Sequence, residues 1–150
     1  MIRGVVFDFG NVLYHVDYAA MARRLAGDRA GELLERFVGS PLQLAYETGR
    51  TDLGGVLRGL EQAGFPCSRE AFLAAYLDIF SPVAGMAELL AAVAARVPVG
   101  LLSNTSPEHA RLAIEAMPEV RHVSARAYSF ELGAMKPDPR LYGTIAERLG

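Results

Sequence analysis

The chain has 150 residues, of which 51% are hydrophobic, and this is enough for one folded domain with a small insertion. Its formal net charge of −2, with basic residues dispersed along the chain, argues against a nucleic-acid partner. Cys67 is the only cysteine, so no internal disulfide can form, which fits a cytoplasmic protein.

No segment has the pattern of a targeting signal or a membrane span. The N-terminal apolar stretch is interrupted by Asp8 and lacks a basic lead, unlike a signal peptide. The apolar run around residues 89–102 contains Arg96 and Pro98, and a membrane span needs ~20 apolar residues. We therefore expect no membrane partner.

The first expected element is a strand from Ile2 to Phe7, which is short, β-branched and apolar on both faces. This pattern is typical of a strand covered by helices on both sides, and it places the strand at the centre of a parallel sheet. Asp8 follows directly, and Gly10 is expected to let the backbone curl there. Ligands of open α/β sheets bind at this end of the strands, so Asp8 is a candidate site residue.

Residues 17–80 have a helical pattern interrupted by glycine and proline, with no run that indicates a strand. We interpret this segment as a helical cap, inserted into an α/β core of residues 1–16 and 81–150. Within the cap, Ser68 is the expected N-cap of a helix from Arg69 to Phe80, whose apolar residues recur at helical spacing.

The α/β pattern resumes after the cap. The expected elements are helices Met86–Arg96, Ser106–Met117 and Asp138–Leu149, and strands Val97–Leu102 and Val123–Ser129. Two of these helices begin with a capping residue followed by proline, which is favourable at the first helical position. The order of elements predicts an α/β fold with a Rossmann-like parallel sheet.

Further polar residues follow the second core strand, where Ser103 and Asn104 come directly after an apolar run. Since parallel strands end at one edge of a sheet, these residues and Asp8 are expected to share a crevice. Each of them alone, like Lys136, is an ordinary turn or surface residue. Together they supply what a carboxylate that attacks phosphorus needs, namely hydrogen-bond donors and a cation that offset the phosphate charge.

The stretch Val5-Val6-Phe7-Asp8-Phe9-Gly10-Asn11-Val12-Leu13, followed in order by Ser103-Asn104 and Lys136, resembles the haloacid dehalogenase superfamily of hydrolases. Within it, the chain is most similar to the small sugar-phosphate phosphatases with a helical cap. The resemblance implies a magnesium-dependent phosphatase in which Asp8 is the nucleophile and forms an aspartyl-phosphate. Ser103 would bind a phosphoryl oxygen, Asn104 would shape the same phosphate-binding loop, and Lys136 would neutralise the nucleophile and the phosphate.

The chain departs from this superfamily at Gly10, where most of its phosphatases carry a second aspartate that protonates the leaving alcohol. General acid catalysis typically contributes ~10² to 10⁴ in rate. We therefore expect a preference for good leaving groups, such as those of sugar 1-phosphates, as in the similar Asp-x-Gly-Asn branch.

A second departure concerns the metal and the end of the chain. The resemblance implies that Asp8 and the Gly10 carbonyl bind Mg²⁺ together with acids on a fourth strand, which would follow Gly150. The expected Mg²⁺ site is thus incomplete, because magnesium prefers six oxygen ligands. The chain is expected either to be a fragment of a longer protein or to form a homodimer, swap strands or aggregate through the exposed edge of its first strand.

Two other functions remain open. In hydrolytic dehalogenation Asp8 attacks carbon and a halide leaves without needing a proton or a metal. A noncatalytic or truncated domain of the same fold is the third interpretation. The segment 46–49 resembles a cap loop that faces the active site, although a helix end explains it equally well.

The sequence assigns no definite function to the three histidines. His15, at the cap junction, is either a substrate contact or a partly exposed structural residue. His109 and His122 lie on an expected helix and a surface segment, and neither is assigned a function.

Overall fold

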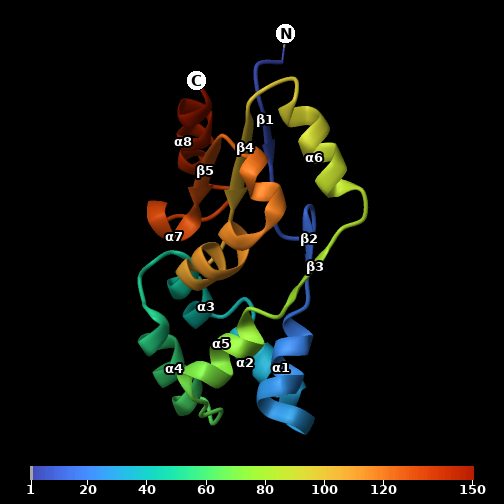
Figure 1. Cartoon of the computed structure of the whole chain (residues 1–150). Helices are drawn as coiled ribbons and strands as arrows, with labels where there is room; N and C mark the ends of the chain where they lie inside the picture. Colours follow the sequence, from blue (N-terminus) through green and yellow to red (C-terminus); the bar gives the residue numbers. More distant parts are fainter. Residues whose placement is uncertain (1) are drawn as a thin grey trace.

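The computed structural model describes residues 2–150 and consists of a three-stranded parallel sheet with flanking helices and a separate group of helices. The two groups lie at opposite ends of an elongated molecule, and the chain begins and ends in the α/β part (Figure 1). The predicted α/β fold is confirmed. Residue 1 of the predicted core segment lies outside the described residues.

The sheet has the order β1-β4-β5, with both neighbouring pairs parallel. Its strands are β1 (Val5–Phe7), β4 (Val99–Ser103) and β5 (Ala125–Tyr128). All five residues of the central strand β4 are buried, because helices cover both faces of the sheet. Gly100 provides room for one of these helices, since a Cβ there would lie 3.0 Å from side-chain atoms of Ile145 and Leu149.

β1 is an edge strand, because within residues 2–150 it pairs only with β4. The central position predicted from its apolar pattern is therefore wrong, whereas the exposed edge expected without a fourth strand is present. The pattern was misleading because covering both faces of a strand does not require a neighbour on both of its edges. Val6 is 42% exposed, and Ile2, predicted as the first residue of the strand, lies outside it.

Helices cover the two faces of the sheet. The first face carries α6 (Met86–Ala94) and the irregular turns η2 (His109–Ala113), η3 (Ile114–Ala116) and η4 (Pro118–His122). The second carries α8 (Pro139–Leu149), and α7 (Ser129–Leu132) follows β5.

The helix starts predicted by the two proline signatures are present. Asp138 caps α8 through the N–H of Arg140, and the Ser106 hydroxyl accepts a hydrogen bond from the N–H of His109. The regular helix predicted over residues 106–117 is wrong, however, because it widens into a π turn at η2 and tightens into 3₁₀ turns after it.

The second group of helices has its own hydrophobic core, built mainly from aromatic and leucine side chains. Its elements are α1 (Tyr18–Ala26), η1 (Gly27–Arg29), α2 (Ala30–Phe37), α3 (Pro41–Glu47), α4 (Leu53–Gln62) and α5 (Arg69–Tyr76). The predicted N-cap of α5 is confirmed, because the Ser68 hydroxyl accepts from the N–H of Ala71 at 3.1 Å.

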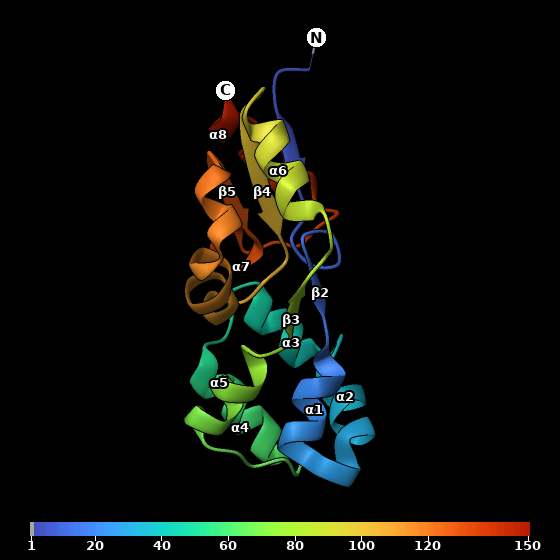
Figure 2. The same ribbon diagram turned by 45° about the vertical axis from the view of Figure 1, so that its right-hand side comes forward.

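A short ribbon that was not predicted connects the two groups. β2 (Tyr14–Val16) pairs antiparallel with β3 (Phe80–Pro82), and both lie between the sheet and the helices (Figure 2). The helix predicted to reach Phe80 therefore ends earlier, at Tyr76. Strands of three residues are too short to show a repeating pattern, and their pairing joins distant parts of the sequence. The division into a core and a cap at these positions stays a prediction.

No helix in residues 2–150 is long and apolar enough to cross a lipid bilayer.

Candidate active site

A pocket of about 230 Å³ lies at the carboxyl ends of β1 and β4, beneath the helical group. All five residues predicted from the sequence line it, namely Asp8, Gly10, Ser103, Asn104 and Lys136. The structure thus brings together groups that are far apart in the sequence, as the switch-point rule for parallel sheets leads one to expect.

Asp8 and Lys136 form an ion pair in this pocket, with Lys136 Nζ 2.6 Å from Asp8 Oδ1. The ammonium group also donates to the carbonyl of Leu102 at 3.2 Å, which fixes it near the end of β4. Asp8 Oδ1 accepts a second hydrogen bond, from the N–H of Phe9 at 2.7 Å. Oδ2 accepts no hydrogen bond from residues 2–150, so one carboxylate oxygen is held and the other is available to a ligand.

Asn104 holds the loop that carries Lys136. Its Oδ1 accepts from the N–H of Lys136 at 2.8 Å, and its Nδ2 donates to the carbonyl of Lys136 at 3.4 Å. The side chain therefore acts as a brace between the end of β4 and the lysine loop. Ser103 is buried, and its hydroxyl makes only a 3.3 Å contact, with the carbonyl of Asn104.

The turn after Asp8 differs from the sequence interpretation. The left-handed residue is Asn11, with φ of 58°, and not Gly10, so Gly10 is not the residue that turns the backbone. What Gly10 provides is space, because a Cβ at this position would lie 3.3 Å from Val16 Cγ2. Asn11 tolerates this conformation because asparagine visits the left-handed region more readily than most residues.

His109, to which the sequence assigned no function, also lines the pocket. The residue is only 3% exposed. Its ring stacks on Tyr76 at 3.6 Å between centroids and places Nε2 2.7 Å from the carbonyl of Tyr76. Burial lowers the pKa of His109 to about 4, although the bond to this carbonyl opposes the shift, so the ring is neutral at pH 7. One signal in the sequence could have indicated that His109 is buried. Ala110, Ala113 and Ile114 recur at helical spacing, which places position 109 beside a buried face.

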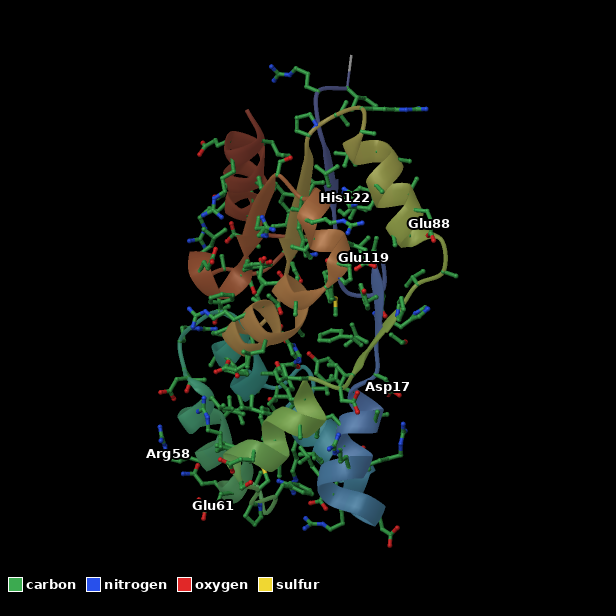
Figure 3. All side chains as sticks on the ribbon, viewed as in Figure 1. Asp17, Arg58, Glu61, Glu88, Glu119 and His122 are labelled. Atoms are coloured by element: carbon green, nitrogen blue, oxygen red, sulfur yellow. The ribbon has the colours of Figure 1, made fainter. Side chains whose placement is uncertain are left out.

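The other histidines lie elsewhere. His15 is exposed in β2 and does not line the pocket, which favours its structural interpretation. His122 lies in η4, in the α/β part of the molecule (Figure 3).

The segment 46–49 docks the helical group onto the sheet. The hydroxyl of Ser129 donates to the carbonyl of Glu47 at 2.6 Å, and a Cβ at Gly49 would collide with the carbonyl of Phe130. The Glu47 carboxylate accepts from Gln43 at 2.8 Å and from Tyr18 at 3.4 Å, and Tyr18 lines the pocket. Burial raises the pKa of Glu47, while these hydrogen bonds lower it.

The donor groups do not fit a complete magnesium site. Residues 2–150 contain no cluster of three or more His, Cys, Asp or Glu residues that could hold a metal ion. The predicted ligands Asp8 and Gly10 offer one carboxylate and one carbonyl, which suit Mg²⁺ in kind but not in number.

The sequence matches the family described as haloacid dehalogenase-like hydrolase over residues 2–150. The chain belongs to this family. Membership of the haloacid dehalogenase-like hydrolases agrees with the predicted α/β fold and with the expected enzyme class, the hydrolases. A comparison with curated protein sequences finds no significant match.

Solved structures of haloacid dehalogenase-like proteins share its fold. A predicted hydrolase of this kind from Porphyromonas gingivalis superimposes with a TM-score of 0.81 at 24% identity, over 98% of this chain and 76% of that one. An enzyme of the family from Bacteroides thetaiotaomicron, in complex with magnesium and inorganic phosphate, gives 0.81 at 22% identity, over 98% and 78%. L-2-haloacid dehalogenase from Xanthobacter autotrophicus gives 0.70 at 19% identity, over 98% and 64%.

Proposed function

We propose that this haloacid dehalogenase-like hydrolase cleaves phosphate monoesters of small sugars through an aspartyl-phosphate on Asp8. The observation that carries the proposal is the 2.6 Å contact of Lys136 Nζ with Asp8 Oδ1, in the pocket that also contains Ser103. The similar Bacteroides enzyme was crystallised with magnesium and inorganic phosphate, the product that such a reaction releases. This supports phosphate as the group that the pocket receives.

In the first step, Asp8 Oδ2 attacks phosphorus and the bond to the leaving oxygen breaks. The Lys136 ammonium and the Ser103 hydroxyl face the phosphoryl oxygens and offset the charge that develops on them. The leaving oxygen takes its proton from water, because position 10 carries no acid. In the second step water attacks the aspartyl-phosphate, phosphate departs, and the Asp8 carboxylate is restored.

Without an acid at position 10, the rate depends strongly on the leaving group. An anomeric oxygen leaves more readily than a primary alkoxide, so a hexose 1-phosphate is the better substrate. Phosphate release from hexose 1-phosphates and 6-phosphates, measured side by side, tests this preference. Equal turnover of the two would contradict it.

The nucleophile is tested by Asp8→Asn, which preserves the shape of the side chain but removes its nucleophilic oxygen. We expect phosphate release to fall to background. The matched control is Asp28→Asn, the same substitution at an exposed residue of η1, which should retain activity. Activity that survives in Asp8→Asn would refute the proposal.

Mg²⁺ bound by Asp8 and Gly10 stays a prediction. If it is correct, chelator abolishes phosphate release and added Mg²⁺ restores it. Binding should be weak, since the pocket offers few protein oxygens.

Hydrolytic dehalogenation is the second candidate, and Gly10 is the observation that favours it, because a halide leaves without a proton. The likeness to the Xanthobacter dehalogenase is compatible with it. Halide release from a 2-haloacid that is indifferent to chelator would select this reaction. If neither phosphate nor halide is released, the noncatalytic interpretation is favoured.

A further inference from the structure

The wall of the pocket formed by His109 and Phe80 offers a free hydrogen-bond acceptor. His109 Nε2 lies 2.7 Å from the carbonyl of Tyr76. A carbonyl can only accept, so Nε2 carries the ring proton and Nδ1 does not. Nδ1 is therefore unprotonated, and its lone pair can accept a hydrogen bond.

By elimination, this lone pair is assigned to the pocket. Within residues 2–150, every fully buried side-chain nitrogen or oxygen has a hydrogen-bond partner, and Nδ1 of His109 has none. Nδ1 must therefore keep contact with solvent, although the residue as a whole is only 3% exposed. Because His109 lines the pocket, this contact is made there.

The ring is held rigidly in this orientation. Tyr76 stacks on one face with an interplanar angle of 11°, and Phe80 meets the ring edge-on at 4.8 Å between centroids. His109 also begins the π turn η2, a rare element that is frequent at functional sites. A fixed acceptor discriminates between ligands better than a mobile one, because no side-chain freedom is lost on binding.

The surroundings indicate what binds there. Phe9 and Phe80 supply aromatic surface to the same pocket, while Asp8 and Lys136 occupy its phosphate end. A bare imidazole nitrogen cannot donate a proton at neutral pH, so His109 does not replace the acid that is missing at position 10. It can only accept a hydrogen bond, and its partner must be a donor such as a hydroxyl.

We propose that His109 is a specificity-determining residue whose Nδ1 accepts a hydrogen bond from a hydroxyl of the leaving group. The pocket then selects phosphate esters of hydroxylated molecules, with the carbon skeleton against the aromatic rings. This inference rests on the proposed function and identifies how the leaving group is recognised.

Binding measurements test it without requiring turnover. Calorimetry on the Asp8→Asn chain compares a hexose 1-phosphate with its monodeoxy analogues, each of which lacks one hydroxyl. We expect about tenfold weaker binding of one analogue, the size of a typical hydrogen bond. Adding His109→Phe, which preserves an aromatic ring but has no Nδ1, should reduce this preference to near one.

Two further variants make the outcome decisive. His109→Gln supplies an N–H near the position of Nε2 for the Tyr76 carbonyl but no acceptor at Nδ1, so it should also lose the preference if the phenylalanine variant does not fold. His122→Phe, the same substitution in η4, should retain the tenfold preference.

A preference that survives in the His109 variants, or that is absent for every hydroxyl, would overturn the inference. The proposed function is judged separately, by phosphate release from the wild-type chain. Hydroxyl-dependent binding without turnover would refute catalysis alone, and turnover with an unaltered preference would refute the role of His109 alone.

Discussion

The buried imidazole of His109 should make folding stability depend on pH in a defined direction. Its pKa falls from 6.5 to about 4, mainly because the charged ring would lose its hydration inside the protein. Between these two values the unfolded chain binds the proton and the folded chain does not, so folding becomes less favourable as the pH falls. The contribution is complete above pH 6.5 and is lost progressively towards pH 4.

The magnitude follows from the shift. About 2.5 pKa units at 1.36 kcal/mol each correspond to about 3 kcal/mol, a large share of the stability of a small domain. Glu47 opposes this trend, because its raised pKa adds stability at low pH that is lost as the pH rises through its folded value. The pH dependence of the unfolding free energy of the wild type therefore contains contributions from both His109 and Glu47.

Variants that cannot titrate at position 109 isolate the histidine. We expect the free energy of unfolding of wild type minus that of His109→Phe to fall by about 3 kcal/mol between pH 7 and pH 4, in urea titrations followed by circular dichroism. His109→Gln should show the same slope, even if its stability at pH 7 differs. A difference that does not vary with pH in either variant would refute a buried, neutral His109.

Other regions give equally definite expectations. Gly10→Asp, combined with Val16→Ala to relieve the 3.3 Å approach, should raise the rate on a hexose 6-phosphate by about 10² relative to the 1-phosphate, whereas Gly10→Asn should not. Ser129→Ala leaves the N–H of Thr105 and the carbonyl of Glu47 without their buried partner and should cost about 3 kcal/mol of unfolding free energy, whereas Ser124→Ala, at an exposed side chain, should cost almost nothing. Association through the free edge of β1 should appear in light scattering at high concentration and be abolished by Val6→Lys, and a strictly monomeric wild type would contradict it.

The sequence was most informative where one residue type is tied to one local requirement. Ser68, Ser106 and Asp138 marked helix starts because their side chains cap free N–H groups, and Asp8 was marked by its place after an apolar strand. These signals are local, so a single chain displays them without knowledge of the tertiary structure.

Features that depend on distant partners were missed. β2 and β3 are three residues each and exist because they pair across the chain, with Val16 opposite Phe80. The burial of His109 depends on Tyr76, and its sequence neighbours reveal only a helical stripe. The apolarity of the two faces of β1 gave the wrong, central position, because it carries no information about which strand lies beside it; the edge was expected only from the family resemblance.

The ribbon β2–β3 contains both passages of the chain between the sheet and the helices, and each strand is the hydrogen-bonded partner of the other. Two linkers that are hydrogen-bonded to each other bend together and act as a single hinge. We therefore expect the helices to swing about a single axis, carrying Tyr18 away from Asp8 while both hydrophobic cores remain packed. Exchange of product for the next substrate would then require release of the contacts that join the two groups. These are the hydrogen bond from Ser129 to Glu47 and the contacts of Tyr76 with His109 and Ser106.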